Sequence, residues 1–504
     1  MQPHAESTHT PSHACALSDV PQWDLEADVV VVGYGAAGAA AAIGAASAGA
    51  SVTLFEVASG RGGTSAMAGG DIYLGGNGGT SAQRENGFED DTEDFYRYMM
   101  MAGGPDADAA RVRFYAENAL DHHRWLQEQG IPYRTTHLPG KVMAPGTGDC
   151  LIWSGNEAAW PFRERAKPCP RGHLPDAAGA LGGGGRMIVD RLGDRAEALG
   201  TDVHFDARVL ALVADEERRI HGVVVRSEGQ TRFARARRGV ILCSGGFVLN
   251  EDMLRLHAPQ SLRLADDALS AGHDDGSGIL MGQSVGGAAI HMDELFVTLA
   301  FYPPSSNVKG ILVNERGQRF VNEDAYPGRI AAQCTRQIGN RIFLLADHAT
   351  FEQPSELSRM EVAAVGGTWA EVEREAGFVE GTLVHTVEVF NRHAARGEDP
   401  LFHKAEEWLA VLDEPPFAAV AMHPGEAFYP FFTLGGLRTR PTGEVLDLEG
   451  EPIAGLYAAG RACSGLPRSA EFYSSGMSLG DCTLFGRLAG HTAAGAAANG
   501  ENAR

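Results

Sequence analysis

The stretch ADVVVVGYGAAG, residues 27–38, decides the fold class of this chain. Its continuous, valine-rich apolar run at 27–32 is typical of a strand buried on both faces. The glycine-rich turn is followed by AAAAIGAASAGA at 39–50, which is typical of a helix, and by the β-rich run SVTLFE, which ends on Glu56. Strand, turn, helix, strand and terminal acid in this order predict a Rossmann-like nucleotide-binding domain in an α/β protein.

Each glycine of the turn has its own physical task. Gly33 permits the sharp bend, Gly35 lets backbone amides approach a pyrophosphate, and Gly38 lets the helix pack close to the strand. The helix N-terminus supplies partial positive charge for the phosphates. Glu56 is placed to hold the ribose hydroxyls of an adenosine, which fits FAD or NAD and disfavours NADP.

A second glycine-rich stretch separates FAD from NAD. GRGGTSAMAGGDIYLGGNGG, residues 60–79, follows the second predicted strand directly. The ribityl chain and ring of a flavin must run past backbone that carries few side chains, whereas a nicotinamide fold normally continues here into an ordinary helix. The sequence therefore favours FAD.

This stretch resembles the GGNS…SGG segment of the fumarate reductase/succinate dehydrogenase flavoprotein superfamily, with Thr64 in place of the asparagine. The resemblance spans roughly residues 25 to 500. It implies FAD, which we expect to be non-covalent because no recognisable histidine anchor lies near the glycine-rich segment. The cofactor contacts that it implies, together with the glycine turn, are Gly33, Gly35, Ala36, Ala37, Gly38, Glu56, Gly62, Gly63, Thr64, Ser65, Gly69, Gly70, Val209, Gly245, Asp275, Gly460, Ser478 and Leu479.

The pattern of elements predicts a discontinuous FAD-binding domain with an inserted α+β cap. We expect helices from about 90 to 200 and alternating strands at 203–243. The composition changes near 290, and GGLRTRPTGEVLDLEGEPIAGLYAAGRACSG at 435–465 returns to the nucleotide domain. The predicted bounds are a disordered tail at 1–22, an FAD-binding domain at 23–288 and 430–504, and a substrate-binding cap at 289–429.

Composition excludes several partners. The net charge of -23 argues against a nucleic-acid or anionic-membrane partner, because both need clustered Lys and Arg. Seven scattered cysteines predict reduced thiols, and no secretory signal or run of eighteen apolar residues is present, so we expect a cytoplasmic protein without a membrane span. His122, His123 and His173 match no common zinc spacing, and the two in the predicted helix, His122 and His123, are interpreted as helix-surface residues. No motif identifies the electron acceptor, which stays unknown.

Near the C-terminus, EFYSSGMSLGD at 471–481 packs hydroxyl side chains directly before a predicted small-residue helix that starts near Met477. In the superfamily this helix points its N-terminus at the flavin, so the hydroxyls are expected beside the ring. Tyr473 and Ser475, with Tyr326 in the cap, resemble the pattern of the 3-ketosteroid Δ4-(5α)-dehydrogenase family. The resemblance implies that Tyr473 binds the carbon-3 oxygen and that Ser475 takes a proton from carbon 4. It also implies that Tyr326 assists Ser475 and shuttles the proton out, and that the flavin receives hydride from carbon 5, which introduces the double bond between carbons 4 and 5. Ser474 is interpreted as a turn residue that satisfies backbone groups.

The substrate predicted by this site is a neutral, apolar ketone. Tyr473 stands where fumarate reductases carry an arginine, and FFTLGG at 431–436 lacks their dicarboxylate-binding histidine. A dianion without such partners would be buried unpaired. The alternatives are a 3-ketosteroid Δ1-dehydrogenase, a reductase of the fumarate or urocanate kind, and a flavin-binding protein without substrate chemistry. A serine is a weak base unless another group activates it, and the sequence near Ser475 contains no histidine for that role.

Overall fold

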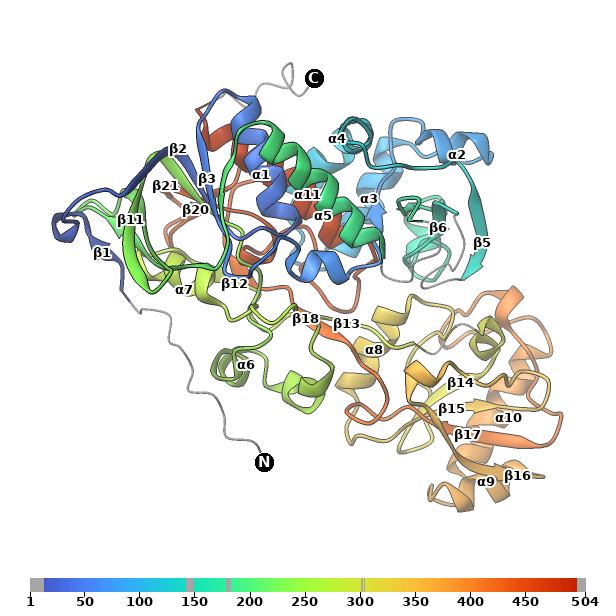
Figure 1. The fold of residues 1–504 in the computed structure, drawn as a ribbon. Helices are drawn as coiled ribbons and strands as arrows, with labels where there is room; N and C mark the ends of the chain where they lie inside the picture. Colours follow the sequence, from blue (N-terminus) through green and yellow to red (C-terminus); the bar gives the residue numbers. More distant parts are fainter. Residues whose placement is uncertain (1–12, 142–148, 178–182, 301, 303, 496–504) are drawn as a thin grey trace.

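The computed structural model describes residues 13–141, 149–177, 183–300, 302 and 304–495. Figure 1 shows a larger body built around a mixed sheet and a smaller body that contains strands β14 to β17. The predicted α/β architecture, with an FAD-type domain and a separate α+β unit, is confirmed.

The predicted nucleotide unit forms as expected in the middle of the larger sheet. It consists of β2 (Leu25–Val32), α1 (Ala36–Ser47) and β3 (Val52–Phe55). β2 lies parallel between β3 and β11 (Gln230–Leu242), and its residues 29–32 are buried. Burial on both faces explains why this strand reads as an unbroken apolar run.

The large sheet combines parallel and antiparallel pairs. Its order in the described chain is β1-β9-β10-β11-β2-β3-β8, and β21 pairs with β11 and carries β20. β11 pairs with three other strands. Its first half pairs antiparallel with β10, and its second half pairs parallel with β21. Its parallel pairing with β2 shifts register between 236 and 239. The other strands of this sheet are β1 (Cys15–Ala16), β8 (Asp202–His204), β9 (Ala207–Ala214), β10 (Ile220–Ser227), β20 (Glu444–Leu446) and β21 (Pro452–Ala458).

The predicted disordered tail is partly wrong. Residues 1–12 lie outside the described residues, but Cys15–Ala16 pair in parallel with the end of β9 at Val213 and Ala214. Leu17, Val20 and Trp23 pack against the same side of the sheet. The short apolar segment therefore completes a sheet edge, which a local search for long hydrophobic patterns does not reveal.

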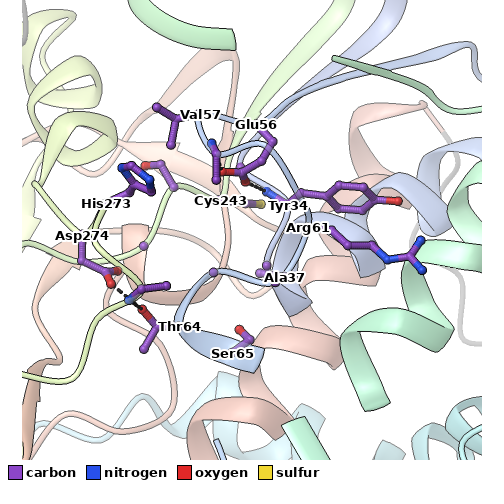
Figure 2. A pocket seen from close by; sticks show the side chains of 18 of the residues that line it. Tyr34, Ala37, Glu56, Val57, Arg61, Thr64, Ser65, Cys243, His273 and Asp274 are labelled. Carbon is purple, nitrogen blue, oxygen red and sulfur yellow. Dashed lines mark hydrogen bonds between the residues drawn. The ribbon is translucent and has the colours of Figure 1, made fainter. Parts of the chain in front are cut away.

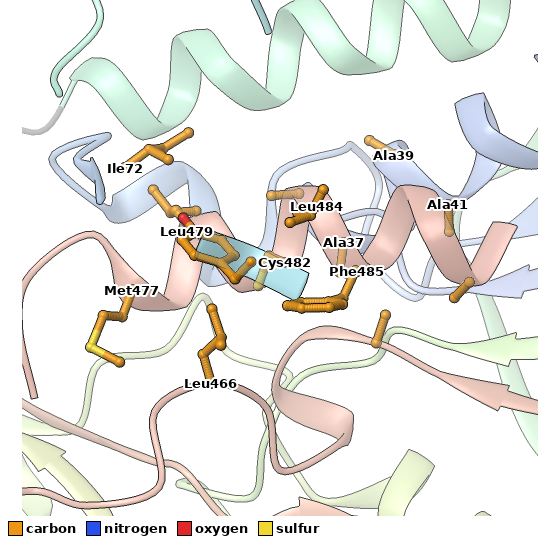
Figure 3. Packing of buried hydrophobic residues seen from close by; sticks show 14 of the residues in the cluster. Ala37, Ala39, Ala41, Ile72, Leu466, Met477, Leu479, Cys482, Leu484 and Phe485 are labelled. Atoms are coloured by element: carbon orange, nitrogen blue, oxygen red, sulfur yellow. The ribbon is translucent and has the colours of Figure 1, made fainter. Parts of the chain in front are cut away.

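Helix α11 (Met477–Ala493) packs backbone to backbone against α1. A Cβ atom at Gly486 would lie 2.6 Å from the Ala37 carbonyl oxygen, and one at Gly490 would lie 2.0 Å from that of Ala41. Figure 3 shows Ala37, Ala39 and Ala41 of α1 beside Leu484 and Phe485 of α11. The contact fixes the N-terminus of α11, and with it the hydroxyl-rich turn, beside the nucleotide unit.

Further helices and a small sheet complete the larger body. The helices are α2 (Ser81–Glu85), α3 (Thr92–Ala102), α4 (Ala109–Glu128), α5 (Gly183–Ala198), α6 (Glu251–His257) and α7 (Ser277–Ser284). The small sheet has the order β4-β7-β6-β5, with β4 at Ile72–Tyr73, β5 at His137–Lys141, β6 at Leu151–Trp153 and β7 at Gly172–His173.

The smaller body is an antiparallel sheet covered by helices, in the order β14-β15-β17-β16. Two short pairs join it to the larger body: β12 (Ala289–Ile290) with β19 (Gly436–Leu437), and β13 (Leu295–Val297) with β18 (Phe431–Thr433). Its elements are β14 (Ile311–Asn314), β15 (Ile342–Ala346), β16 (Glu361–Gly366), β17 (Phe417–Ala421), α8 (Pro327–Arg336), α9 (Trp369–Glu375) and α10 (Thr382–Ala394).

Candidate active site

The glycine turn after β2 has no room for side chains at two positions. Gly33 has a φ of +100°, and a Cβ there would lie 2.6 Å from the Cys243 carbonyl oxygen. A Cβ at Gly38 would lie 1.9 Å from the Gly33 carbonyl oxygen, so α1 approaches the turn as closely as the sequence predicted. Gly35 caps α1, and the helix begins at the edge of a cavity.

That cavity has a volume of about 570 Å³ and lies between the glycine turn, the second glycine-rich stretch and the loops after β11 and β21. Figure 2 shows Glu56, Thr64, Ser65 and Asp274 around it. Its volume is within the range of small-molecule sites. The predicted cofactor residues that line it are Gly33, Gly35, Ala36, Ala37, Glu56, Gly62, Gly63, Thr64, Ser65, Val209, Gly245 and Gly460.

The other predicted cofactor residues are not among those that line the cavity. Gly70 has a φ of +91° and touches the backbone of Gly184, which leaves no space for a side chain. Asp275 accepts a hydrogen bond of 2.8 Å from Arg208, and it is Arg208 that lines the cavity. The remaining residues of this group are Gly38, Gly69, Ser478 and Leu479.

Asp274, next to the predicted Asp275, organises one end of the cavity. Its Oδ2 accepts hydrogen bonds from the hydroxyls of Thr64 at 2.5 Å and Ser270 at 2.6 Å, and its Oδ1 forms a 2.8 Å salt bridge with Arg461. One carboxylate thus ties the second glycine-rich stretch to the loop after β21. Asp274 and Asp275 are adjacent in the sequence, and only the tertiary fold decides which of the two lines the cavity.

Glu56 lines the opposite part of the cavity and is held by backbone groups. Its carboxylate accepts hydrogen bonds from the backbone N–H of Tyr34 at 2.6 Å and of Ala58 at 2.8 Å. The side chain is 6% exposed. These bonds fix the orientation of the acid that the sequence assigned to the adenosine ribose.

The hydroxyl-rich turn before α11 packs against the segment at 71–73. Gly476 has a φ of +94°, and a Cβ there would lie 2.7 Å from the Tyr73 nitrogen and 3.1 Å from Cγ of Asp71. The Tyr73 N–H donates a 3.3 Å hydrogen bond to the Gly476 carbonyl. Glycine is required here because any side chain would push the turn away from Asp71 and Tyr73.

Tyr473 is a buried phenol in an aromatic cluster. Its hydroxyl donates a 2.9 Å hydrogen bond to Ser478 Oγ, and its ring centre lies 4.6 Å from that of Phe296 and 6.5 Å from that of Phe432. Burial raises the pKa of the Tyr473 phenol, an effect that the hydrogen bond with Ser478 opposes. Tyr473 therefore stays protonated near neutral pH and can act as a hydrogen-bond donor.

Tyr326 reaches the same cluster from the smaller body. It precedes α8, is 8% exposed, and its ring centre lies 6.4 Å from that of Tyr473. Burial raises the pKa of the Tyr326 phenol well above its usual value, Tyr473 and Tyr302 add to this rise, and the hydroxyl of Ser475 opposes it as a hydrogen-bond partner. The fold thus brings together the three hydroxyl residues that the sequence singled out.

Ser474 does not have the role expected of it. It is fully buried, and its hydroxyl lies 2.7 Å from the hydroxyl of Tyr98 on α3. The same Tyr98 oxygen accepts a 2.8 Å hydrogen bond from the Asn156 backbone N–H. Ser474 therefore anchors the turn to Tyr98 of α3, and through Tyr98 to Asn156, instead of satisfying its own backbone.

Two residues of this region were missed by sequence reasoning. Asn156 joins the two bodies: its Oδ1 accepts a 3.0 Å hydrogen bond from the Tyr326 N–H, and its Nδ2 donates one of 3.4 Å to the Tyr473 carbonyl. Asp71 lies beside Ser475. The available signals were an acid isolated in a glycine-rich apolar stretch and an amide after Gly155, and neither pattern is specific.

A family model described as FAD binding domain matches residues 28–474. The chain belongs to this family. Its members bind FAD, so the predicted cofactor is confirmed and this protein is a flavin-dependent oxidoreductase.

Individual proteins similar to this one cover most of the chain. A crystal structure of 3-ketosteroid-Δ4-(5α)-dehydrogenase from Rhodococcus jostii RHA1, in complex with 4-androstene-3,17-dione, is 42% identical, with a TM-score of 0.90 over 96% of this chain and 99% of that one. The 3-oxo-5-alpha-steroid 4-dehydrogenase of Comamonas testosteroni is 28% identical, over 88% of this chain and 94% of its own. A protein named Probable fumarate reductase Ifc3, from Shewanella frigidimarina, is 27% identical, over 92% and 74%. The expected resemblance is confirmed.

The cavity of this flavoprotein suits FAD in its chemistry. Gly35, Gly62 and Gly63 present backbone without side chains along the wall where the helix begins, and Glu56 lines the same cavity. At the other end, Gly460 is followed by Arg461, whose guanidinium lies 5.1 Å from the ring centre of Phe432. The cavity therefore leads from the glycine turn toward the aromatic cluster around Tyr473.

Two histidines of the flavoprotein, His122 and His123, are not exposed as predicted. His122 and His123 lie on the inner face of α4 and are buried, which corrects the interpretation of both as surface residues. His122 is hydrogen-bonded to Thr483, and His173 to Thr80. The seven cysteines are free thiols. Within the described ranges no cluster of three or more potential metal ligands occurs, and none of the described helices has the length and apolar character needed to cross a bilayer.

Proposed function

We propose that this protein is an FAD-dependent 3-ketosteroid dehydrogenase that introduces the double bond between carbons 4 and 5 of 3-keto-5α-steroids. The observation that carries the proposal is the meeting of Tyr473, Ser475 and Tyr326, from both bodies, within one buried aromatic cluster. The similarity to the Rhodococcus jostii RHA1 and Comamonas testosteroni enzymes supports the same substrate class.

In the proposed reaction, Tyr473 donates its hydrogen bond to the ketone oxygen on carbon 3 instead of to Ser478. This interaction makes the protons on carbon 4 more acidic, because it stabilises negative charge that develops on the oxygen. Ser475 removes one of these protons, and Tyr326 supports the serine oxygen through its own hydroxyl. FAD, when bound, supplies the acceptor for the hydride that leaves carbon 5.

The polarity of the cluster favours a neutral substrate. Phe296 and Phe432 stack at 4.6 Å and flank Tyr473 with apolar surface. Arg461 approaches Phe432, but its charge is paired with Asp274. Among the described residues, the cation that contacts Phe432 already has a carboxylate partner, so a dianionic dicarboxylate that lost its hydration there would be poorly compensated, which counts against fumarate chemistry.

The proposed function is tested by anaerobic flavin reduction. The 5α-saturated counterpart of 4-androstene-3,17-dione should bleach the yellow flavin of the purified protein in a single turnover, and mass spectrometry should detect 4-androstene-3,17-dione as the product. Failure of the saturated steroid to bleach the flavin contradicts the proposal.

A second substrate separates the two positions of desaturation. 4-Androstene-3,17-dione itself already contains the double bond between carbons 4 and 5, so it should leave the flavin oxidised. Bleaching by this compound would instead indicate desaturation between carbons 1 and 2. Fumarate, tested as an oxidant of the chemically reduced protein, should not restore the yellow colour.

A further inference from the structure

Asp71 is a buried acid that the proposed reaction has not yet used. It is 8% exposed and comes directly after Gly70, whose left-handed backbone packs tightly against Gly184. Among the described residues, neither of its carboxylate oxygens has a partner at regular hydrogen-bond geometry. An unpaired buried carboxyl is costly unless it is protonated or has a role in function.

The carboxyl of Asp71 lies against the turn that carries Ser475. The side-chain-free Gly476 allows this approach, since a Cβ there would lie 3.1 Å from Cγ of Asp71. Ser475 is fixed by a pair of hydrogen bonds with Ser154: the Ser475 N–H donates to the Ser154 carbonyl at 3.0 Å, and Ser154 Oγ donates to the Ser475 carbonyl at 3.3 Å. Burial raises the pKa of Asp71 to about 7, the hydroxyls of Ser154 and Ser475 oppose this rise, and the nearby Glu157 adds to it.

The titratable groups around Asp71 are compatible with a pKa near 7, so its carboxylate can act as a base near neutral pH. Glu157 is itself buried, and burial raises its pKa. The backbone of His173 approaches Asp71, and burial lowers the pKa of the His173 imidazole to about 3, so this ring is neutral. The phenols that interact electrostatically with Asp71 come from four other parts of the chain and all have raised pKa values; they are Tyr115, Tyr133, Tyr326 and Tyr473.

We propose that Asp71 is the acceptor of the substrate proton, which it receives through the hydroxyl of Ser475. The inference rests on the proposed function, and it supplies the activation that a serine base needs. As the bond between carbon 4 and its hydrogen breaks, the proton joins Ser475 Oγ, and the original hydroxyl proton of Ser475 passes to Asp71. The electron pair of the broken bond stays on the substrate and forms the new double bond as hydride leaves carbon 5. Asp71 ends the step as a neutral acid, and Ser475 is unchanged.

This assignment predicts a pH dependence of the chemical step. Asp71 must be ionised before it can take a proton, so flavin reduction by the saturated steroid should accelerate as pH rises through about 7. Below that pH the acid is already protonated, and Ser475 has no acceptor. A serine that worked without Asp71 would show no such inflection.

The test compares Asp71→Asn with Glu157→Gln, which removes the other buried acid of the same region. Rapid-mixing measurements under anaerobic conditions should show that Asp71→Asn retains FAD and binds 4-androstene-3,17-dione normally, but reduces flavin about 100- to 10,000-fold more slowly and without the inflection. Glu157→Gln should remain active, with its inflection at lower pH, because Glu157 raises the pKa of Asp71. Infrared spectra provide a readout besides activity: the carbonyl band of a buried protonated carboxyl should disappear as pH rises through about 7 in the wild type and be absent from Asp71→Asn.

The possible outcomes separate the two proposals. A wild type that no 3-ketosteroid bleaches contradicts the proposed function. A wild type that is bleached, together with an Asp71→Asn variant of similar rate and unchanged pH profile, overturns the role of Asp71 alone. If Asp71→Asn does not retain FAD, the pH dependence of the wild type tests the role of Asp71 instead. A rate of flavin reduction that does not vary between pH 5 and 9, or a carboxyl infrared band that persists at pH 9, overturns that role.

Discussion

The two halves of the candidate active site are built in opposite ways. The cofactor cavity is formed largely by backbone: two stretches, 32–37 and 55–67, supply much of its wall, and several of its glycines cannot carry a side chain. The hydroxyl cluster is formed by side chains from segments far apart in sequence, namely Asp71, Asn156, Tyr326 and the turn at 473–475.

This difference determines which kinds of substitution each half of the site can tolerate. The cavity is sensitive to added atoms, because a Cβ at a tight glycine collides with backbone that cannot move. The cluster is sensitive to removed atoms, because each hydroxyl, amide or carboxyl has a distinct partner. Substitutions in the two halves should therefore fail in different ways: the first by loss of FAD, the second by loss of turnover with FAD still bound.

The largest effect is expected at Gly33. Gly33→Ala places a methyl group 2.6 Å from the Cys243 carbonyl at a φ of +100°, so the turn must open and FAD should be lost on purification. Gly60→Ala is the matched control in the same cavity wall, because a Cβ there meets nothing within 4 Å. Flavin absorbance per polypeptide measures both. Full FAD content in Gly33→Ala would contradict the backbone interpretation.

The next effect is expected from the hydroxyl turn. Tyr473→Phe and Ser475→Ala should each retain FAD but lower the rate of flavin reduction about 100- to 1,000-fold, because one removes the donor to the ketone and the other removes the hydroxyl that takes the proton from carbon 4. Ser474→Ala in the same turn loses only its bond to Tyr98, so it should lower stability by about 1 kcal/mol and leave most of the rate. Equal rates for all three variants would show that the order of hydroxyls in this turn has no chemical meaning.

A smaller effect is expected from Asn156, which holds the two bodies in register. Asn156→Ala removes the bonds to the Tyr326 N–H and the Tyr473 carbonyl, so the two phenols should be less well positioned. We expect kcat to fall about tenfold with little change in FAD content. Steady-state kinetics with the saturated steroid measure the change. An unchanged kcat would mean that other contacts suffice to dock Tyr326.

The last expected effect is on stability, not on FAD content or rate, and it comes again from Asp71. Its pKa in the folded protein, about 7, lies above its ordinary value of 3.8. The stability associated with the protonated form is therefore present below pH 4 and is lost as pH rises to about 7, by up to about 4 kcal/mol. Asp71→Asn cannot ionise, so its Tm relative to the wild type should be higher at pH 8 than at pH 4.5. A Tm difference that does not vary with pH would contradict a raised pKa.

Much of the cofactor half could be predicted from the sequence, because its signals are local. Gly33, Gly35 and Gly38 keep their spacing within one strand–turn–helix unit, and Glu56 follows at the end of the next strand. The predicted cofactor residues that do not line the cavity include Asp275, whose neighbour Asp274 lines it. The direction in which each acid points depends on partners more than 180 residues away, such as Arg461 and Thr64.

Three residues of the hydroxyl half, Tyr326, Tyr473 and Ser475, were predicted through a family resemblance. The residues that support them were not predicted. Ser474 was assigned to its own turn because short-range bonding is the usual role of serine, yet it bonds to Tyr98 across 376 positions of sequence. Asn156 and Asp71 lie in ordinary-looking segments. No pattern indicates that these segments meet at the N-terminus of α11.

The sequence by itself determined the elements and the cofactor class, since the period of apolar residues and the placement of glycines are written along the chain. Only the tertiary structure decided which acid stands behind Ser475 and which amide links Tyr326 to Tyr473. The physical reason is that burial and close contact set the pKa and the hydrogen bonds of these groups. Both depend on glycine-mediated packing of α11 against α1 and of Gly476 against Asp71, contacts that exist only after the chain has folded.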